Sequence, residues 1–146
     1  MASEPPKHLF TVLCEDIRKE ELNKVSLMGV YSDRIYFQKR PLQIRSLAFF
    51  NRFSEGRGTF SLAFHITGPK SELIFETKPE EAKFPIALDS PITSISLVLG
   101  NFEFKDEGPH NFEVHLDDQK FATFPFDVRV KPGHFSEGNL PGPPKS

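Results

Sequence analysis

The chain lacks several features that would narrow its chemistry. Cys14 is its single cysteine, so an intrachain disulfide and a zinc site built from several thiolates are excluded. It has no tryptophan, so the Cys-Trp-Cys core of antibody domains is absent. It also has no apolar run long enough to span a bilayer, and its N-terminus, MASEPPKH, lacks the apolar stretch of a signal peptide. We therefore expect a soluble, cytoplasmic protein without a membrane partner.

Charge and motifs exclude further classes. The formal net charge of −2 gives no reason to expect nucleic acid as a partner. Phosphate-binding, dinucleotide-binding and nucleophile-elbow motifs are missing, and the five histidines show no H-E-x-x-H spacing. We therefore predict no catalytic residues and no cofactor.

Phenylalanine is abundant instead, with 16 residues in a chain of 146. Because its ring is large and carries no polar group, this number indicates a core filled mainly by aromatic rings. The 13 prolines and nine glycines are spread between short apolar runs, which is typical of many turns and few helices.

The clearest structural signal is a hairpin over residues 108–131. Apolar and polar residues alternate on both sides of a turn at Asp117-Asp118-Gln119. The residues predicted to face inward are Phe112, Val114, Leu116, Phe124, Phe126, Val128 and Val130. A lone hairpin is not stable in water, so a second layer must cover its apolar face.

The rest of the chain supplies further short strands. The clearest lie at residues 8–17, 25–31, 45–53, 59–67, 72–77 and 92–99. Residues 78–83 are expected to form a charged loop and residues 84–88 a short edge strand, and Gly100-Asn101 should interrupt the strand before residues 102–104. Eight or nine short strands predict an all-β, antiparallel β-sandwich with an immunoglobulin-like layout, and a small β-barrel is the alternative. We expect a flexible tail at 1–7, one domain at 8–131 and a disordered Pro/Gly-rich tail at 132–146.

Two blocks resemble a known family. The first block consists of LCEDIR at residues 13–18 and NKVSLMGVY at residues 23–31. The second block is the hairpin over residues 108–130. Together they resemble a family of short, functionally uncharacterised bacterial proteins that open with C-[DE]-D-x-R and a G-[VI]-Y strand. The resemblance implies a bacterial, cytoplasmic setting and no catalytic residues.

Cys14 and the histidines are the candidates for chemistry. Cys14 lies in an apolar strand without an assigned base, so we interpret it as a buried structural thiol. His65 and His115 lie on the polar faces of their strands and would approach each other if those strands were neighbours, but exposed strand histidines are far commoner than ligand pairs. The turn carboxylates form no calcium-loop motif. The turn carboxylates considered as calcium ligands are Asp89, Asp106, Glu107, Asp117 and Asp118. We predict no metal site among these carboxylates or the histidines.

A candidate interaction patch lies at Phe50 and Arg52. Phe49 and Phe50 are neighbours on a strand, so their rings point to opposite faces of the sheet. The face that carries Leu47, Phe49 and Phe53 is more apolar than the face that carries Phe50, so it should be the one that faces the core. Phe50 should therefore face outward, covered by the chain or by a partner, with Arg52 at the rim.

Three hypotheses follow for function. The first is a non-enzymatic protein-interaction or structural module that binds a protein partner or itself. The alternative is a sandwich that binds a ligand or metal, of the calcium or lipid type. An enzyme that uses Cys14 or a histidine–carboxylate pair ranks last.

Overall fold

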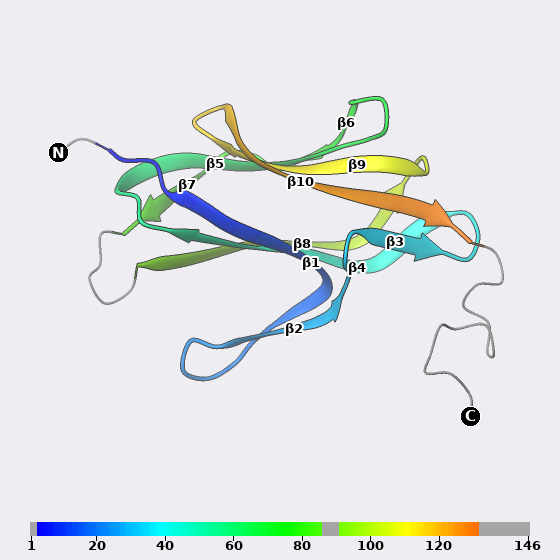
Figure 1. The fold of residues 1–146 in the computed structure, drawn as a ribbon, viewed down its shortest axis with the longest axis horizontal. Coiled ribbons are helices and arrows are strands. Elements are labelled where there is room, and N and C mark those ends of the chain that lie inside the picture. The colour runs from blue at the N-terminus through cyan, green and yellow to red at the C-terminus, as the bar shows by residue number, and fades with distance from the viewer. Residues whose placement is uncertain (1–2, 86–90, 132–146) are drawn as a thin grey trace.

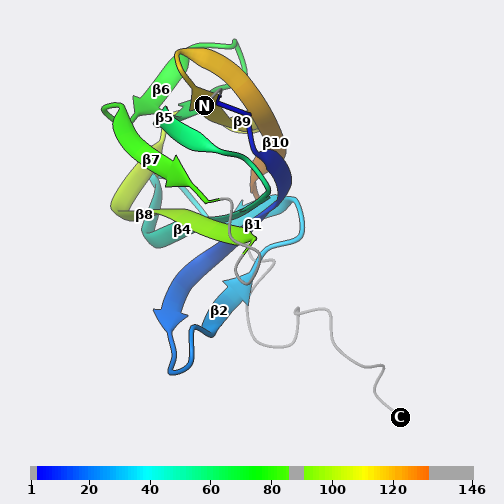
Figure 2. The same ribbon diagram turned by 90° about the vertical axis from the view of Figure 1, so that its left-hand side faces the viewer.

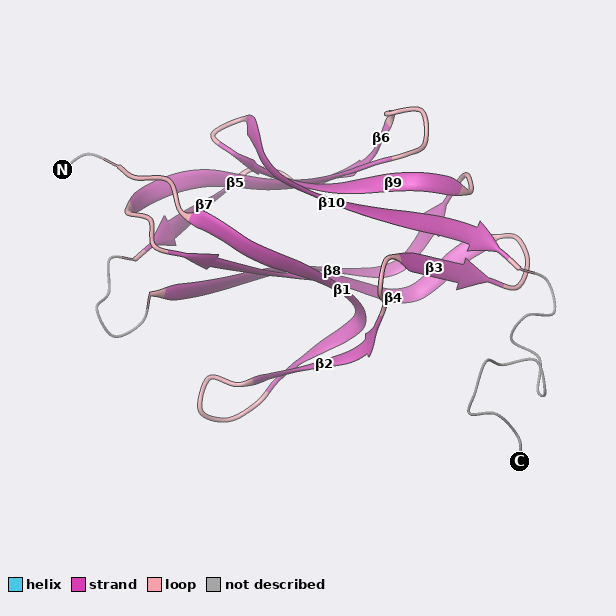
Figure 3. Cartoon of the chain, viewed as in Figure 1, coloured by secondary structure: helices cyan, strands magenta, loops and turns pink. Residues whose placement is uncertain are grey.

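The computed structural model describes residues 3–85 and 91–131, and within them every regular element is a strand (Figures 1 and 3). The ten strands are β1 (Lys7–Lys19), β2 (Val25–Val30), β3 (Arg34–Phe37), β4 (Leu42–Ser54), β5 (Gly58–Thr67), β6 (Leu73–Glu76), β7 (Glu80–Phe84), β8 (Ile92–Phe104), β9 (Gly108–Leu116) and β10 (Gln119–Val130). No helix in these ranges is long and apolar enough to cross a membrane.

The strands form two layers that face each other across the core (Figure 1). One sheet has four strands in the order β2-β1-β4-β8. The other has six, in the order β3-β10-β9-β5-β6, with β7 also paired to β5. All pairings are antiparallel except that of β3 with β10, which is parallel. The predicted β-sandwich is confirmed, and the alternative of a closed barrel is wrong.

Aromatic rings fill the space between the sheets, as the phenylalanine content predicts. Phe49 of β4 stacks on Phe112 of β9, with 4.1 Å between the ring centroids. Phe64 of β5 also stacks on Phe112, with 5.3 Å between the ring centroids. Phe49 and Phe112 are fully buried. This stack joins the two layers at the centre of the core.

The predicted hairpin over residues 108–131 is β9 and β10. Its seven inward residues all belong to the core or pack against it. Asp117 and Asp118 have φ of 50° and 65°, the left-handed conformations of both central residues in a tight hairpin turn. Aspartate tolerates this conformation better than most residues, which explains why the turn falls there.

Two elements differ from the prediction. β8 continues through Gly100 and Asn101 instead of ending there. The alternation of its side chains shifts at this point: before it, odd-numbered residues such as Leu97 face the core, and after it the even-numbered Phe102 and Phe104 do. Asn101, with φ of 51°, makes this shift. β7 (Glu80–Phe84) takes up residues 80–83 of the segment 78–83 that is predicted as a charged loop. It forms there because pairing with β5 satisfies its backbone despite its polar sequence. Residues 86–90, which include Asp89 and most of the candidate strand at 84–88, lie outside the described residues.

The N-terminal segment predicted as a flexible tail is paired with the domain over its described part. The Glu4 amide donates to the Arg57 carbonyl oxygen at 2.9 Å, and the Arg57 amide donates to that of Glu4 at 2.8 Å. β1 then begins at Lys7. The tail predicted at 132–146 lies outside the described residues.

Candidate functional site

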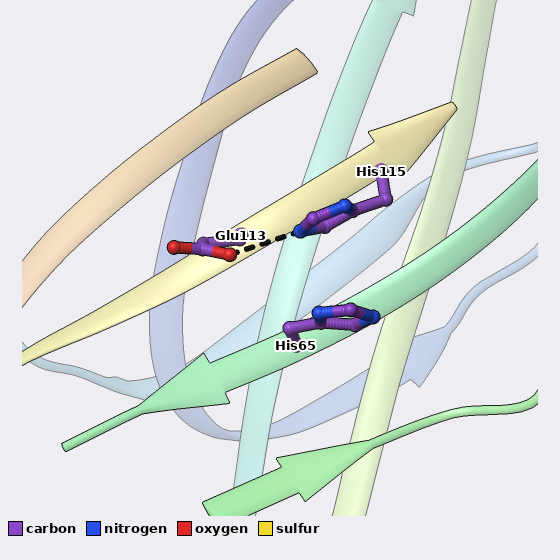
Figure 4. Close-up of side chains that lie close together, drawn as sticks. All are labelled: His65, Glu113 and His115. Atoms are coloured by element: carbon purple, nitrogen blue, oxygen red, sulfur yellow. Dashed lines mark hydrogen bonds and ion pairs between the residues drawn. The ribbon is translucent and has the colours of Figure 1, made fainter. Parts of the chain in front are cut away.

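Three potential metal ligands lie together on the outer face of the six-stranded sheet (Figure 4). His65 comes from β5, and Glu113 and His115 come from β9. The antiparallel register places His65 directly opposite Glu113 and Ala63 opposite His115. Because residues two apart on a strand share a face, the three side chains meet on one side of the sheet.

The three side chains contact one another closely. The rings of His65 and His115 are stacked, with 3.9 Å between centroids and 24° between planes. Nε2 of His115 lies 2.9 Å from Oε1 of Glu113, and Nζ of Lys120 lies 3.4 Å from Oε2 of the same carboxylate. One ligand atom from each of His65, Glu113 and His115 lies within 4.8 Å of the other two.

The electrostatic surroundings favour the neutral imidazole of His65 and the ionised carboxylate of Glu113. Burial lowers the pKa of His65, and so does the neighbouring His115 ring. Burial opposes ionisation of Glu113, but the hydrogen bond with His115 and the Lys120 ammonium outweigh it and lower the pKa of the carboxyl group. An uncharged imidazole nitrogen and a carboxylate oxygen are the forms that bind metals.

A half-open hollow of about 520 Å³ lies beside the two histidines. Ala63, opposite His115, forms part of its wall with a small side chain. Glu76 also borders it, with its Oε2 3.8 Å from Nε2 of His65. The remaining lining residues are Thr77, Lys78, Pro79 and Asp118.

Sequence reasoning anticipated part of this cluster. It placed His65 and His115 on polar faces and made their approach depend on strand adjacency, which the β5–β9 pairing supplies. It missed Glu113, although Glu113 shares the parity of His115. Within residues 3–85 and 91–131, the turn carboxylates considered for calcium form no group of three or more close donors.

In the predicted patch at Phe50 and Arg52, the Phe50 ring is expected to face outward and to be covered either by the chain or by a partner. Phe50 lies outside the core cluster, but it is only 3% exposed. The Arg52 guanidinium carbon lies 5.4 Å from the centre of its ring, and the Phe10 ring lies 6.3 Å away. The chain itself therefore covers Phe50, and Phe10, at 41% exposure, is the accessible ring of this face.

Cys14 is free and fully buried, and its thiol contacts the backbone oxygen of Asp16 at 3.5 Å. Burial raises the pKa of the thiol, and the neighbouring Asp16 and Glu15 charges add to this effect. A raised pKa disfavours the thiolate that a nucleophile needs. The arrangement is that of a structural thiol.

A second candidate site is the edge of β8 that faces away from β4, which no other strand within residues 3–85 and 91–131 pairs with; we call it the free edge of β8 (Figure 2). The four-stranded sheet ends at β8, whose other side pairs with β4. Between β8 and the strands β5 and β7 lies a groove of about 310 Å³, lined by apolar Leu62, Phe64, Ile95 and Leu97 among others. Val98 on the same strand is 54% exposed.

Comparison with known proteins identifies the family of the chain but assigns no activity to it. The chain belongs to DUF6941, a family of unknown function whose profile matches residues 9–129, so the prediction of an uncharacterised family is confirmed. No curated protein matches the chain. Among solved structures, it is similar to an immunoglobulin-like protein from Pseudomonas aeruginosa, at 13% identity over 88% of this chain and 100% of that one, with a TM-score of 0.36.

Proposed function

We propose that this member of the family is a non-catalytic interaction module that associates with a second copy of itself along the free edge of β8. A free strand edge presents unpaired N–H and C=O groups that pair with another chain unless the sequence guards against it. The observation that carries the proposal is that β8 lacks such guards.

The other edges of the two sheets are short or charged. β3, β6 and β7 have four, four and five residues, and each contains at least one charged side chain. β2 has six residues, and Gly29 with φ of 63° disturbs its end. β8 has 13 residues and no charge from 92 to 102. Asn101 limits the regular part of its edge to residues 92–99.

The β8 sequence is compatible with antiparallel pairing to itself. Residues directly opposite each other in such a pair lie on the same face of the sheet. Inward Ile95 and Leu97 of one copy must therefore lie opposite inward residues of the other. This holds when the two-fold axis passes through a residue and not between two residues, and the residues nearest the middle of the run are Ile95 and Ser96. Without charges in this run, no like charges are brought together.

The groove beside β8 favours an added strand for a separate reason. Apolar Leu62 and Phe64 line it together with charged Lys78 and Glu80, and the two apolar side chains are already buried in the core. The apolar surface that a second β8 would bury is therefore mainly that of β8 itself, including half-buried Ile95 and exposed Val98. Burial of apolar surface is the main stabilising contribution in self-association.

Sedimentation equilibrium over a range of protein concentrations tests the proposal. The wild-type chain should form dimers, and Ser96→Lys, at an exposed position near the axis, should weaken the dimer by about tenfold or more, because two ammonium groups would meet there. Ser96→Ala and Thr59→Lys, the latter at an exposed position of β5, are the matched controls and should dimerise like the wild type. A wild-type chain that stays monomeric, or a Ser96→Lys variant that dimerises normally, contradicts the proposal.

A further inference from the structure

We infer that His65, Glu113 and His115 form a binding site for one divalent transition-metal ion, with Zn²⁺ as the best match. This site lies on the opposite sheet from β8 and does not depend on the proposed self-association. It rests on the placement of three donors by two central strands, on the chemistry of these donors and on the hollow beside them.

The strands that carry the donors are fixed on both sides. β9 pairs with β10 and β5, and β5 pairs with β9 on one side and with β6 and β7 on the other. The side chains are themselves largely buried: 24% of the His65 side chain is exposed, 11% of Glu113 and 16% of His115. Donors held on packed strands lose little freedom when an ion binds, which favours affinity.

The donors reach an ion by side-chain rotation. With bonds of 2.0–2.1 Å to a tetrahedral zinc ion, neighbouring ligand atoms lie about 3.3 Å apart. The three atoms lie within 4.8 Å of one another, so they must shift by about 1–2 Å. The two stacked imidazole rings must also turn out of their stack, because each nitrogen binds a metal through a lone pair in the plane of its ring. The hydrogen bond between His115 and Glu113 would give way to bonds from both residues to the ion.

The donor set selects the class of ion. Two imidazole nitrogens and one carboxylate oxygen suit zinc and its neighbours among the first-row transition metals. Calcium and magnesium prefer sets of oxygen ligands, which this cluster does not provide. Three protein ligands leave a fourth position, and the hollow of about 520 Å³ next to both histidines offers space there for water or a small anion.

Lys120 is the residue that competes with the ion. Its ammonium group lies 3.4 Å from Oε2 of Glu113 and would repel a cation bound there. Its side chain is 56% exposed, so it can turn into solvent when the ion binds. Removing this charge should therefore strengthen metal binding without touching a ligand.

The alternative is that the cluster is only a polar network that stabilises the outer face of the sheet. In that network His115 and Lys120 hold the Glu113 carboxylate, and His65 packs against the His115 ring. Such a network predicts no specific affinity for metal. Metal binding and its loss on substitution separate the two roles.

The test uses the full chain without a polyhistidine tag, after treatment with a chelator. Calorimetric titration with Zn²⁺ should give one ion per chain, and Co²⁺ should give the visible absorption of a four- or five-coordinate site. His65→Gln and His115→Gln should each weaken binding by at least about tenfold, and Lys120→Gln should strengthen it a few-fold. His8→Gln removes a histidine from β1 in the other sheet and is the matched control, with affinity unchanged.

Thermal unfolding provides a second readout that also checks folding. Zn²⁺ should raise the melting temperature of the wild type and of His8→Gln, but not of His65→Gln or His115→Gln, because a ligand stabilises only the folded state that binds it. A wild-type chain without Co²⁺ absorption overturns the inference. So does a folded His65→Gln variant that binds Zn²⁺ as tightly as the wild type.

Discussion

The two sheets have similar inner faces and very different outer faces. Inside, both present phenylalanine and aliphatic side chains to one core. Outside, the four-stranded sheet carries Phe50, Phe10 and Val98 next to a free uncharged edge, whereas the six-stranded sheet carries His65, Glu113 and His115. The two proposals follow this difference: self-association is proposed for the edge of the four-stranded sheet and metal binding for the outer face of the six-stranded sheet.

The comparison also separates facing outward from being exposed. Phe50 and Glu113 both lie on outer faces, yet they are only 3% and 8% exposed. Arg52 and Phe10 cover the first, while His115 and Lys120 neighbour the second. An outer face of a β-sandwich can therefore hold a small second core, apolar on one sheet and polar on the other.

The largest effect is expected in the core that the sheets share. Phe112→Ala should lower the free energy of unfolding by about 3–5 kcal/mol, because it removes the ring that stacks on both Phe49 and Phe64. Chemical denaturation measures this change. The control is Phe10→Ala, at a ring that is 41% exposed, which should cost clearly less. Equal losses for the two variants would show that Phe112 does not join the layers.

The small apolar core on the outer face of the four-stranded sheet should come next. Phe50→Ala should cost about 3 kcal/mol, near the lower end of the range for buried rings, since partly exposed Arg52 forms one side of its surroundings. Phe50→Glu should cost more, because it buries a carboxylate. Unchanged denaturant midpoints for both variants would show that the buried Phe50 ring does not stabilise the fold.

Cys14 on the four-stranded sheet should show a smaller effect. Cys14→Ser should lower the free energy of unfolding by about 1–2 kcal/mol, because it places a hydroxyl group in a fully buried position. The native wild-type thiol should react with a thiol-specific reagent far more slowly than the unfolded one. Fast native labelling below the free-thiol pKa would instead support a nucleophilic role.

The polar cluster of the six-stranded sheet should tolerate substitution best. Glu113→Gln keeps the shape of the side chain and a hydrogen-bond acceptor near His115 but removes the charge that pairs with Lys120. The expected loss of unfolding free energy, measured without metal, is about 1 kcal/mol. A loss as large as that for Phe50→Ala would mean that the cluster is a main stabilising element of the fold.

The fold follows from the sequence where the information is local. Alternation places Phe64, Phe112 and Leu97 on inner faces, and the paired aspartates mark the hairpin turn. Alternation does not state which strands become neighbours. The meeting of His65 with Glu113 depends on pairing between β5 and β9, which are far apart in the chain, and the free edge of β8 depends on the order of the whole sheet.

Amide hydrogen exchange along β8, measured at several protein concentrations, tests the central claim most directly. We expect the amides of residues 92–99 that are not paired with β4 to become protected as the concentration rises, because a second β8 then accepts their hydrogen bonds. Amides of β7 serve as an internal reference and should not change, and Ser96→Lys should abolish the protection. Exchange along β8 that does not vary with concentration would contradict the account.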